Sequence, residues 1–552
     1  MGLLRIVLLA VVLAALLPGG AQAASPGLNI MNGSDLGTLD DSGMLRDTGA
    51  RWARHFVSWN ELEPAKGSLA TSRLDQYALT FDREAAVGAS SMVVVTRSPA
   101  WASGSGDPNT PPRRASDYAD FVRALARRWK GKVEVYEIWN EQDEGQFWAG
   151  GPEPARYAEL LRAAYAAIKA EDPAAKVAFG PTTGNNYEFL EAAYEAGAGG
   201  SFDAVSVHTD TACLDRGPGN FYRENGRIAR FSFLGYREVH ATMAKRGDGA
   251  KPIYMSELGW ASTGSLVCSR GRWAGQKPAG VSEADQARHL AEAYHCLAED
   301  PYVEIAIWFL NKDLGTANEE LNRYGLKRFD GSLKPAYAAF KDVTAGRDAV
   351  SGPCADFGGP KVEVLSPKPG QRAFDRLLVH ATSPDADLAR LSYYVDGTRV
   401  ENFGTSPLLR NWMGVRRLGF GAHTLRVEAV DRSGNATQVE VPFQRVDPRT
   451  LPAQATRFSA LKLGGGGRVR TVRGRLRAPG LEIAPLGKVR SVWQHRRGGR
   501  WRTVHGSLRN AGQTFGFSQR LKVAGRWRVR VQYAGAKPFR RAATPWKGFR
   551  VR

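Results

Sequence analysis

The chain has 552 residues, of which 24% are charged and 43% are hydrophobic, and its formal net charge is +21. This length excludes a single ordinary domain, so we expect two or three. The charge is unevenly distributed, because residues 451–552 hold 25 Lys and Arg against one acid, Glu482, whereas the remainder is slightly acidic. The basic character therefore belongs to the C-terminal region and says nothing about the chemistry of the rest.

The N-terminus has the pattern of a secretory signal. Arg5 precedes an apolar run over residues 6–17, and Ala21-Gln22-Ala23 provides a small-residue cleavage site, so residues 1–23 are expected to be removed. A membrane anchor is the alternative, but the run is shorter than the roughly 20 residues that a spanning helix needs. The sequence thus predicts a secreted or cell-wall-associated protein without a transmembrane anchor.

From residue 24 to 346, apolar β-branched segments alternate with segments of helical periodicity. Residues 91–97 (SMVVVTR) show the continuous β-branched run that is typical of parallel strands covered on both faces. Ser282 and Asp285 form a helix-capping signature. Strands are expected at 27–33, 50–59, 91–97, 133–141, 176–180, 202–208, 251–260 and 303–311, and helices at 44–50, 73–87, 117–129, 155–169, 189–196, 234–245, 282–299 and 336–343.

Eight strand–helix units in this order predict an α/β fold, a (β/α)8 TIM barrel. An open doubly wound sheet is the alternative. It is disfavoured because no Gly-rich phosphate-binding pattern follows the first strand.

The pattern changes after a Gly- and Pro-containing linker at 347–360. Short alternating strands and turns predict an immunoglobulin-like β-sandwich over 361–445, and a second linker at 446–456 leads to a small basic antiparallel β domain over 457–552. There Arg alternates with apolar residues, which places one strand face in a core and Arg on the other. We expect this domain to bind an acidic cell-wall polymer, such as a phosphate polymer or a uronate polysaccharide. The alternative is a solvated Arg-rich face, and export argues against nucleic acid.

Two acids stand at the ends of predicted strands four and seven. Glu141 ends VEVYEIWNE, and Glu257 lies near the end of KPIYMSELGW. In a (β/α)8 barrel such positions converge on one mouth. Paired carboxylates suit glycoside hydrolysis, where they stand about 5–5.5 Å apart in retaining enzymes and about 6.5–9.5 Å apart in inverting ones.

Residues 27–346 resemble retaining glycoside hydrolases of clan A, which carry an Asn-Glu pair after strand four and a second Glu after strand seven. The resemblance implies that Glu141 is the general acid/base, that Glu257 is the nucleophile, and that Asn140 binds the sugar 2-hydroxyl. The segments SPAWAS and WNELEP are most similar to those of families 39 and 5.

The same resemblance suggests further site residues. Arg54, in WARHFVSWNELEP, matches the arginine that is aimed at the nucleophile, and Trp308 matches the aromatic floor under the sugar; a structural Arg and a core Trp are the alternatives. His208 is expected to line the site. Many clan members have Tyr two residues after this His, whereas this chain has Asp210, so Tyr222 is a possible substitute. Ring stacking on sugars is expected of Trp residues near the strand ends, with packing as the alternative: Trp101, Trp139, Trp148 and Trp260.

The four cysteines are expected to form disulfides in an exported protein, with free buried thiols as the alternative. Cys213 and Cys268 follow predicted strands six and seven, and Cys296 and Cys354 could tie the last barrel helices to the end of the domain, so the pairs proposed are Cys213–Cys268 and Cys296–Cys354. Neither CxxC nor HExxH spacing occurs, so no metal or cofactor is expected.

The predicted function is hydrolysis of a polysaccharide or oligosaccharide. A catalytically inactive carbohydrate- or wall-binding protein on the same barrel is the alternative, and another reaction on this fold is a third. The joint presence of the catalytic and supporting residues named above argues against loss of activity.

Overall fold

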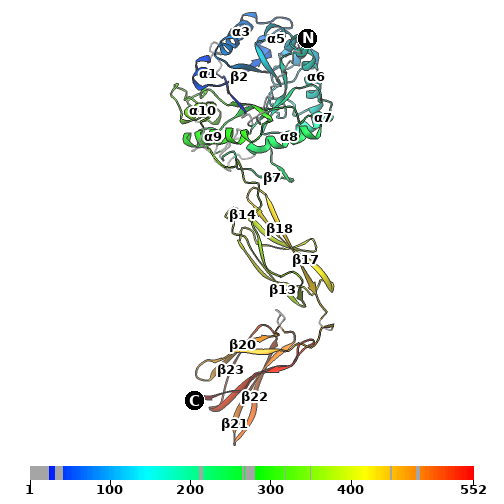
Figure 1. Ribbon diagram of the computed structural model, residues 1–552, viewed down its shortest axis with the longest axis vertical. Helices are drawn as coiled ribbons and strands as arrows, with labels where there is room; N and C mark the ends of the chain where they lie inside the picture. Colours follow the sequence, from blue (N-terminus) through cyan, green and yellow to red (C-terminus); the bar gives the residue numbers. More distant parts are fainter. Residues whose placement is uncertain are drawn as a thin grey trace, which may run out of the picture. The chain divides into compact units, whose positions relative to one another are not determined.

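The computed structural model describes residues 24–31, 41–209, 216–263, 267, 280–317, 319–347, 350–447, 450–479 and 485–552 (Figure 1). The chain divides into two units, residues 1–356 and 357–552. The expected signal, residues 1–23, lies outside the described residues. Within the described ranges, no helix has both the length and the apolar character that crossing a bilayer requires.

In the first unit, eight parallel strands form a closed barrel in the order β1-β10-β9-β6-β5-β4-β3-β2. Pairing of β1 with β10, with Ser25 opposite Ile305, closes the sheet and excludes the open alternative. Every strand predicted for the barrel is confirmed. The barrel strands are β1 (Ser25–Asn29), β2 (Trp52–Ser58), β3 (Ser90–Thr96), β4 (Val133–Ile138), β5 (Lys176–Thr182), β6 (Ala204–His208), β9 (Ile253–Leu258) and β10 (Val303–Trp308).

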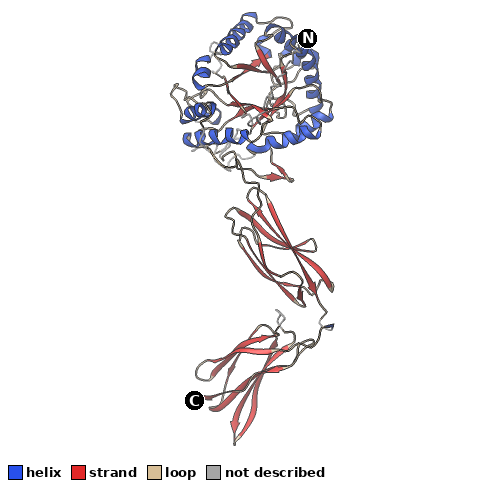
Figure 2. Ribbon diagram, in the orientation of Figure 1, coloured by secondary structure: helices blue, strands red, loops and turns tan. Residues whose placement is uncertain are grey.

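Helices surround the strands of the barrel (Figure 2), and the eight predicted ones are confirmed. Ser282 caps α9, since its hydroxyl accepts a hydrogen bond from the Asp285 amide at 3.1 Å. Short elements in the loops, including α2, α4 and a β-hairpin, were not predicted. The helices are α1 (Ser42–Thr48), α2 (Trp59–Leu62), α3 (Thr71–Ala86), α4 (Ala100–Ser103), α5 (Ala115–Arg128), α6 (Pro154–Glu171), α7 (Tyr187–Glu195), α8 (Tyr236–Lys245), α9 (Glu283–Ala298) and α10 (Pro335–Thr344), and the hairpin is β7 (Arg223–Glu224) with β8 (Arg227–Ile228).

Neighbouring residues along a barrel strand pack into two different cores. Val93 and Val95 of β3 belong to the large core between strands and helices, whereas Met92 belongs with Val135 to a small core inside the barrel. Burial on both faces explains the continuous apolar run in β3. Two residues after Val135, on the same strand face, Glu137 brings a carboxylate into the barrel interior.

The second unit holds two pairs of β-sheets, which confirms the β-sandwich and the antiparallel basic domain. The first pair is β11-β13-β16 with β12-β18-β17-β14-β15, and the second is β19-β20-β23 with β22-β21-β24-β25, where β26 also pairs with β24. Their strands are β11 (Glu363–Ser366), β12 (Gln371–Ala373), β13 (Arg376–Thr382), β14 (Leu388–Val395), β15 (Thr398–Asn402), β16 (Leu408–Gly414), β17 (Gly421–Asp431), β18 (Ala436–Arg445), β19 (Arg457–Gly464), β20 (Val469–Arg477), β21 (Lys488–Arg497), β22 (Arg500–Asn510), β23 (Thr514–Arg520), β24 (Gly525–Tyr533), β25 (Ala542–Ala543) and β26 (Lys547–Val551).

One of the two proposed disulfides is present. Cys296 of α9 is bonded to Cys354, with the two Cα atoms 4.7 Å apart, so this prediction is confirmed. The bond fixes the segment after α10 to the barrel. The other proposed pair, Cys213–Cys268, lies outside the described residues.

Candidate active site

The two acids predicted from the sequence lie together at the mouth of the barrel, where the carboxyl ends of the strands meet. Glu257 is the second-last residue of strand β9, and Glu141 follows β4 by three residues. A carboxylate oxygen of each lies within 4.8 Å of the other. Their side chains are largely buried, with 16% of Glu141 and 9% of Glu257 exposed.

His208, the last residue of β6, bridges these carboxylates. Its Nδ1 lies 2.8 Å from Oε1 of Glu141, and its Nε2 lies 3.4 Å from Oε1 of Glu257. Burial, with a further contribution from Arg54, lowers the pKa of His208 to about 4. The imidazole is therefore neutral near pH 7 and carries its proton on one nitrogen, so it donates one hydrogen bond and accepts another.

Arg54 of β2 is completely buried and connects four polar side chains. Its Nη1 lies 2.6 Å from Oε1 of Glu257, and its Nε lies 2.6 Å from Oε2 of Glu137. Its Nη2 donates to Oδ1 of Asn140 at 3.2 Å and lies 3.4 Å from Nε2 of His208. One buried guanidinium thus orients the predicted nucleophile and the Asn of the Asn-Glu pair.

Glu137 was missed by the sequence analysis. It is fully buried on β4, and its sole described polar partner is Arg54, because its other oxygen accepts no hydrogen bond from the described residues. The signal that points to it is strand periodicity, since Glu137 shares the interior face with Val135. A charged residue at an interior position requires a buried partner of opposite charge.

The backbone after β4 takes an uncommon conformation that presents Asn140 and Glu141 at the mouth. Trp139 and Glu141 have φ angles of 69° and 49°, in the left-handed region that non-glycine residues seldom adopt. Hydrogen bonds hold them there, from the Trp139 amide to the Val95 carbonyl and from the Glu141 amide to the Pro181 carbonyl, each at 3.0 Å. The neighbouring strands β3 and β5 thus stabilise a strained turn.

The electrostatic environment distinguishes the two acids. Burial, reinforced by the nearby Asp143, raises the pKa of Glu141 to about 8. Burial also raises the pKa of Glu257, but His208 and Arg54 oppose this rise, and the Arg54 guanidinium is in direct contact. The proton of the pair therefore resides on Glu141, while the cation favours the ionised form of Glu257.

Asp143 is a second residue that the sequence analysis missed. Its Oδ1 accepts a hydrogen bond from the Thr183 amide at 2.9 Å, and its Oδ2 accepts from Asn186 at 2.7 Å and from Arg230 at 3.1 Å. It follows Glu141 by two residues. The bonds from Thr183 and Asn186 attach the loop that carries Glu141 to the loop after β5, and the bond from Arg230 attaches it to the segment after β8.

Most of the Trp residues that were predicted to contact sugars are buried in the protein core. Trp308 is fully buried, stacks on Trp260 with ring centroids 6.3 Å apart, and donates its indole N–H to the Tyr324 carbonyl at 3.0 Å. Trp101 is half-buried, and its indole donates to the Glu63 carbonyl at 2.9 Å. The remaining two predicted rings are fully buried: Trp139 and Trp148.

A Tyr beside the nucleophile is not among the described contacts of the Glu257 carboxylate, which are with Arg54 and His208. Asp210 lies outside the described residues. For Tyr222, the backbone amide donates to the Ser232 hydroxyl at 3.3 Å, and its predicted role beside Glu257 stays a prediction.

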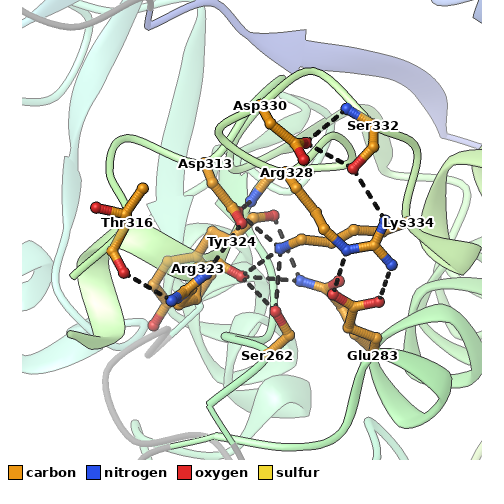
Figure 3. Close-up of polar contacts among 12 residues, drawn as sticks. Ser262, Glu283, Asp313, Thr316, Arg323, Tyr324, Arg328, Asp330, Ser332 and Lys334 are labelled. Carbon is orange, nitrogen blue, oxygen red and sulfur yellow. Dashed lines mark hydrogen bonds and ion pairs between the residues drawn. The ribbon is translucent and has the colours of Figure 1, made fainter. Parts of the chain in front are cut away.

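A buried polar cluster holds the loop after β10, which carries Tyr324, against the loop after β9 and against α9 (Figure 3). The Lys334 ammonium lies 2.7 Å from Oδ1 of Asp313, and donates at 3.0 Å to the Ser262 hydroxyl and the Arg323 carbonyl. All three ammonium donors are thereby used. The cluster fixes the segment that in turn accepts the Trp308 indole N–H.

The ligand atoms of Glu141, His208 and Glu257 lie within 4.8 Å of one another, a spacing that a metal ion can also use. The Arg54 guanidinium, 2.6 Å from Glu257, disfavours a second cation at this position. The arrangement is instead suited to moving one proton between neighbouring groups.

No protein-family profile matches the chain, and no curated protein matches it. Among solved structures, it is similar to a family 39 glycoside hydrolase from Bacteroides cellulosilyticus, at 16% identity and a TM-score of 0.48, covering 91% of this chain and 81% of that one. It is also similar to a monomeric beta-xylosidase from Caulobacter crescentus, at 16% identity and a TM-score of 0.43, covering 93% and 97%. A third is a family 5 (subfamily 18) glycoside hydrolase from Streptomyces cattleya in complex with GlcNAc, at 17% identity and a TM-score of 0.44, covering 64% and 84%.

Proposed function

We propose that the protein is a secreted glycoside hydrolase that cleaves O-glycosidic bonds of a polysaccharide or oligosaccharide with retention of configuration. The observation that carries the proposal is the 4.8 Å limit on the distance between carboxylate oxygens of Glu141 and Glu257. Retaining enzymes hold their carboxyl groups about 5–5.5 Å apart, whereas inverting enzymes need about 6.5–9.5 Å to admit a water molecule. The short separation favours direct attack by one carboxylate.

In the first step, the Glu257 carboxylate attacks the anomeric carbon, and the bond from that carbon to the leaving oxygen breaks. Glu141 gives its proton to the leaving oxygen, which its pKa of about 8 permits at neutral pH. In the second step, the ionised Glu141 takes a proton from water, whose oxygen displaces Glu257 from the anomeric carbon. Arg54 disperses the negative charge of Glu257 before attack and after release.

His208 can serve both protonation states of Glu141 by changing tautomer. When Glu141 is protonated, its hydroxyl donates to Nδ1 at 2.8 Å, and the Nε2 proton points to Glu257. When Glu141 is ionised, Nδ1 carries the proton and donates to it, while Nε2 accepts from Arg54 at 3.4 Å. His208 is therefore a positioning residue between the two acids.

Substrate contacts are proposed for two further residues, Asn140 and Trp101. The Asn140 carbonyl oxygen accepts from Arg54, which leaves the amide NH₂ as a donor toward a sugar 2-hydroxyl. Trp101 keeps exposed ring surface that a pyranose can cover. Trp308 is buried, and its indole N–H is bonded to the Tyr324 carbonyl. Contact of its ring with a sugar would require the ring to become exposed.

The test is a screen of aryl glycosides and polysaccharides, with the anomeric configuration of the first-formed product read by NMR. The wild-type protein should release product of retained configuration, and Glu257→Gln should be inactive. Glu304→Gln is the matched control, because Glu304 is an exposed acid at the opposite end of the neighbouring strand β10. Inverted product would contradict the assigned mechanism, and equal activity of Glu257→Gln and wild type would contradict the site.

A further inference from the structure

One sheet of the basic β domain presents a face of arginine and tryptophan that the proposed catalysis does not use. In β24, Trp527, Val529 and Val531 are buried in the domain core. Because side chains alternate along a strand, Arg526, Arg528 and Arg530 lie on the opposite face. We call this outer face of β22, β21, β24 and β26 the Arg-Trp face.

Arg528 lies in the middle of the Arg-Trp face and is held in place from one side. It is opposite Gln494 of β21, to whose amide oxygen its Nε donates at 2.8 Å. Gln494 in turn donates to the Thr503 hydroxyl of β22 at 3.1 Å. On the other side, Arg528 is opposite Gly548 of β26, which has no side chain to cover it. Among the described residues, no hydrogen-bond acceptor is assigned to its two Nη groups.

Two indole rings flank this guanidinium. The Cζ of Arg528 lies 4.5 Å from the ring centroid of Trp501 and 4.3 Å from that of Trp546, and the Cζ of Arg530 lies 4.6 Å from Trp546. Both rings are half-buried, so each keeps exposed surface beside the cation. Cation–π contact restrains the arginine side chains and reduces the entropy that they lose on binding a ligand.

The charge of this domain is almost uncompensated within its own sequence. That sequence contains Glu482 as the single acid against 25 Lys and Arg beyond residue 450, so most neutralising anions must come from outside the domain. Further exposed arginines share the Arg-Trp face: Arg490, Arg496, Arg526 and Arg550. A solvated arginine surface accounts for the exposure of these side chains but not for two indole rings placed around one oriented guanidinium.

We infer that the Arg-Trp face binds an anionic polysaccharide through the carboxylates of its uronic acid units. A guanidinium fork matches a carboxylate in two hydrogen bonds, and an adjacent indole provides a flat apolar surface for the pyranose ring that bears it. A single uronate unit satisfies both groups at once. The inference concerns binding by a β domain and does not require the proposed barrel activity.

The test uses the full chain carrying Glu257→Gln, so that hydrolysis cannot alter the polymer, and measures binding to polygalacturonate by affinity electrophoresis near 0.15 M salt. Arg528→Gln and Trp546→Ala should each weaken binding by about tenfold, since each removes one of the two contacts. The matched control is Arg475→Gln, an exposed arginine on β20 in the other sheet of the same domain. It removes the same charge and should change affinity by less than about twofold.

Methyl-esterified polygalacturonate, double-stranded DNA and inorganic polyphosphate separate the possible ligands. Loss of binding on esterification, with weaker binding to DNA and polyphosphate, supports the inference. Binding to DNA or polyphosphate as tight as to polygalacturonate, equal effects of Arg475→Gln and Arg528→Gln, or no binding to polygalacturonate would each overturn it. Activity of the wild-type chain on small aryl glycosides is recorded separately, so failure of this inference and failure of the barrel chemistry are distinguishable.

Discussion

The barrel mouth and the basic β domain treat charge in opposite ways. At the mouth, the buried Arg54 is shared between the carboxylates of Glu137 and Glu257, both 2.6 Å away. In the basic domain, arginines line an exposed sheet face, and the sequence offers a single acid, Glu482. Buried charges must find partners inside the protein, whereas exposed charges can be left for solvent or a ligand.

This difference indicates two kinds of site. Charges that compensate one another are fixed before substrate arrives. This suits a site in which an attacking group and a proton donor must keep fixed positions. Charges without internal partners gain most from a ligand that supplies the missing sign. We therefore expect charge removal to cost stability and activity in the barrel, and mainly binding in the β domain.

The largest effect is expected from Arg54→Met. It leaves Glu137 and Glu257 without their shared cation, so the free energy of unfolding should fall by about 3–5 kcal/mol. The pKa of Glu257 should rise further, and kcat should fall by about 10²–10³-fold because this proposed nucleophile becomes protonated and loses its orientation. Urea unfolding and steady-state kinetics measure the two effects.

The double variant Arg54→Met/Glu137→Gln is the control for this prediction. Removing one of the two stranded charges should recover part of the lost stability without restoring activity, since Glu257 still lacks its partner. An Arg54→Met protein as stable as wild type would contradict the view that the mouth is internally compensated.

A second buried pair tests whether compensation extends beyond the mouth. Lys334 and Asp313 are 1% and 0% exposed, so Lys334→Met should lower the free energy of unfolding by about 3–5 kcal/mol. The matched control is Lys341→Met, whose exposed ion pair with Asp47 at 3.2 Å should contribute at most about 1 kcal/mol. Equal effects in thermal or urea unfolding would show that burial does not determine how much an ion pair contributes to stability.

A smaller effect is expected from salt, which should change the stability of the basic domain more than that of the barrel. Raising ionic strength from 0.05 to 0.5 M screens repulsion among exposed arginines and should stabilise the basic domain by about 1 kcal/mol, while the buried pairs of the barrel change little. Hydrogen exchange of the intact chain, followed by mass spectrometry, resolves peptides from β21 and β24 and peptides from β3 and β9. Equal gains in protection for the peptides of the basic domain and of the barrel would contradict the proposed difference between exposed and buried charges.

The smallest effect concerns the pH dependence of the proton donor. In the proposed mechanism Glu141 must be protonated to act, so kcat/KM should fall as pH rises through its pKa of about 8. The neighbouring Asp143 carboxylate raises that pKa. Asp143→Asn removes the like charge and leaves Arg230 less neutralised, so the alkaline limb should move to lower pH. A limb that stays in place, or moves to higher pH, would show that Asp143 does not influence Glu141.

Strand and helix periodicity was sufficient to predict the barrel, because a two-sided core imposes continuous apolar runs such as that of β3 and the helices present one apolar face. The convergence of Glu141 and Glu257 at the mouth followed from their positions at the ends of strands four and seven. The confirmed Cys296–Cys354 bond was predicted from the position of Cys296 in the last long helix of the barrel and of Cys354 just after the barrel sequence.

Other features depend on side-chain neighbours that no local pattern specifies. In the sequence alone, Glu137 is indistinguishable from an outward-facing acid on a half-exposed strand. Its buried position is explained only by the contact with Arg54, which is 83 residues away in sequence. The burial of Trp308 depends on Trp260 and on the Tyr324 carbonyl, both contributed by other segments. In the basic domain, alternation predicted an arginine face, but the two indoles around Arg528 come from β22 and from the segment before β26.

The central claim is that Glu257 attacks the anomeric carbon while Glu141 supplies the proton. The most direct measurement is labelling with a mechanism-based fluorosugar inhibitor matched to the best substrate of the screen, followed by peptide mass mapping. We predict a covalent glycosyl adduct on Glu257 in the wild-type protein and none in Glu257→Gln. An adduct on Glu141, Glu137 or any other residue, with Glu257 unmodified, would contradict the assignment.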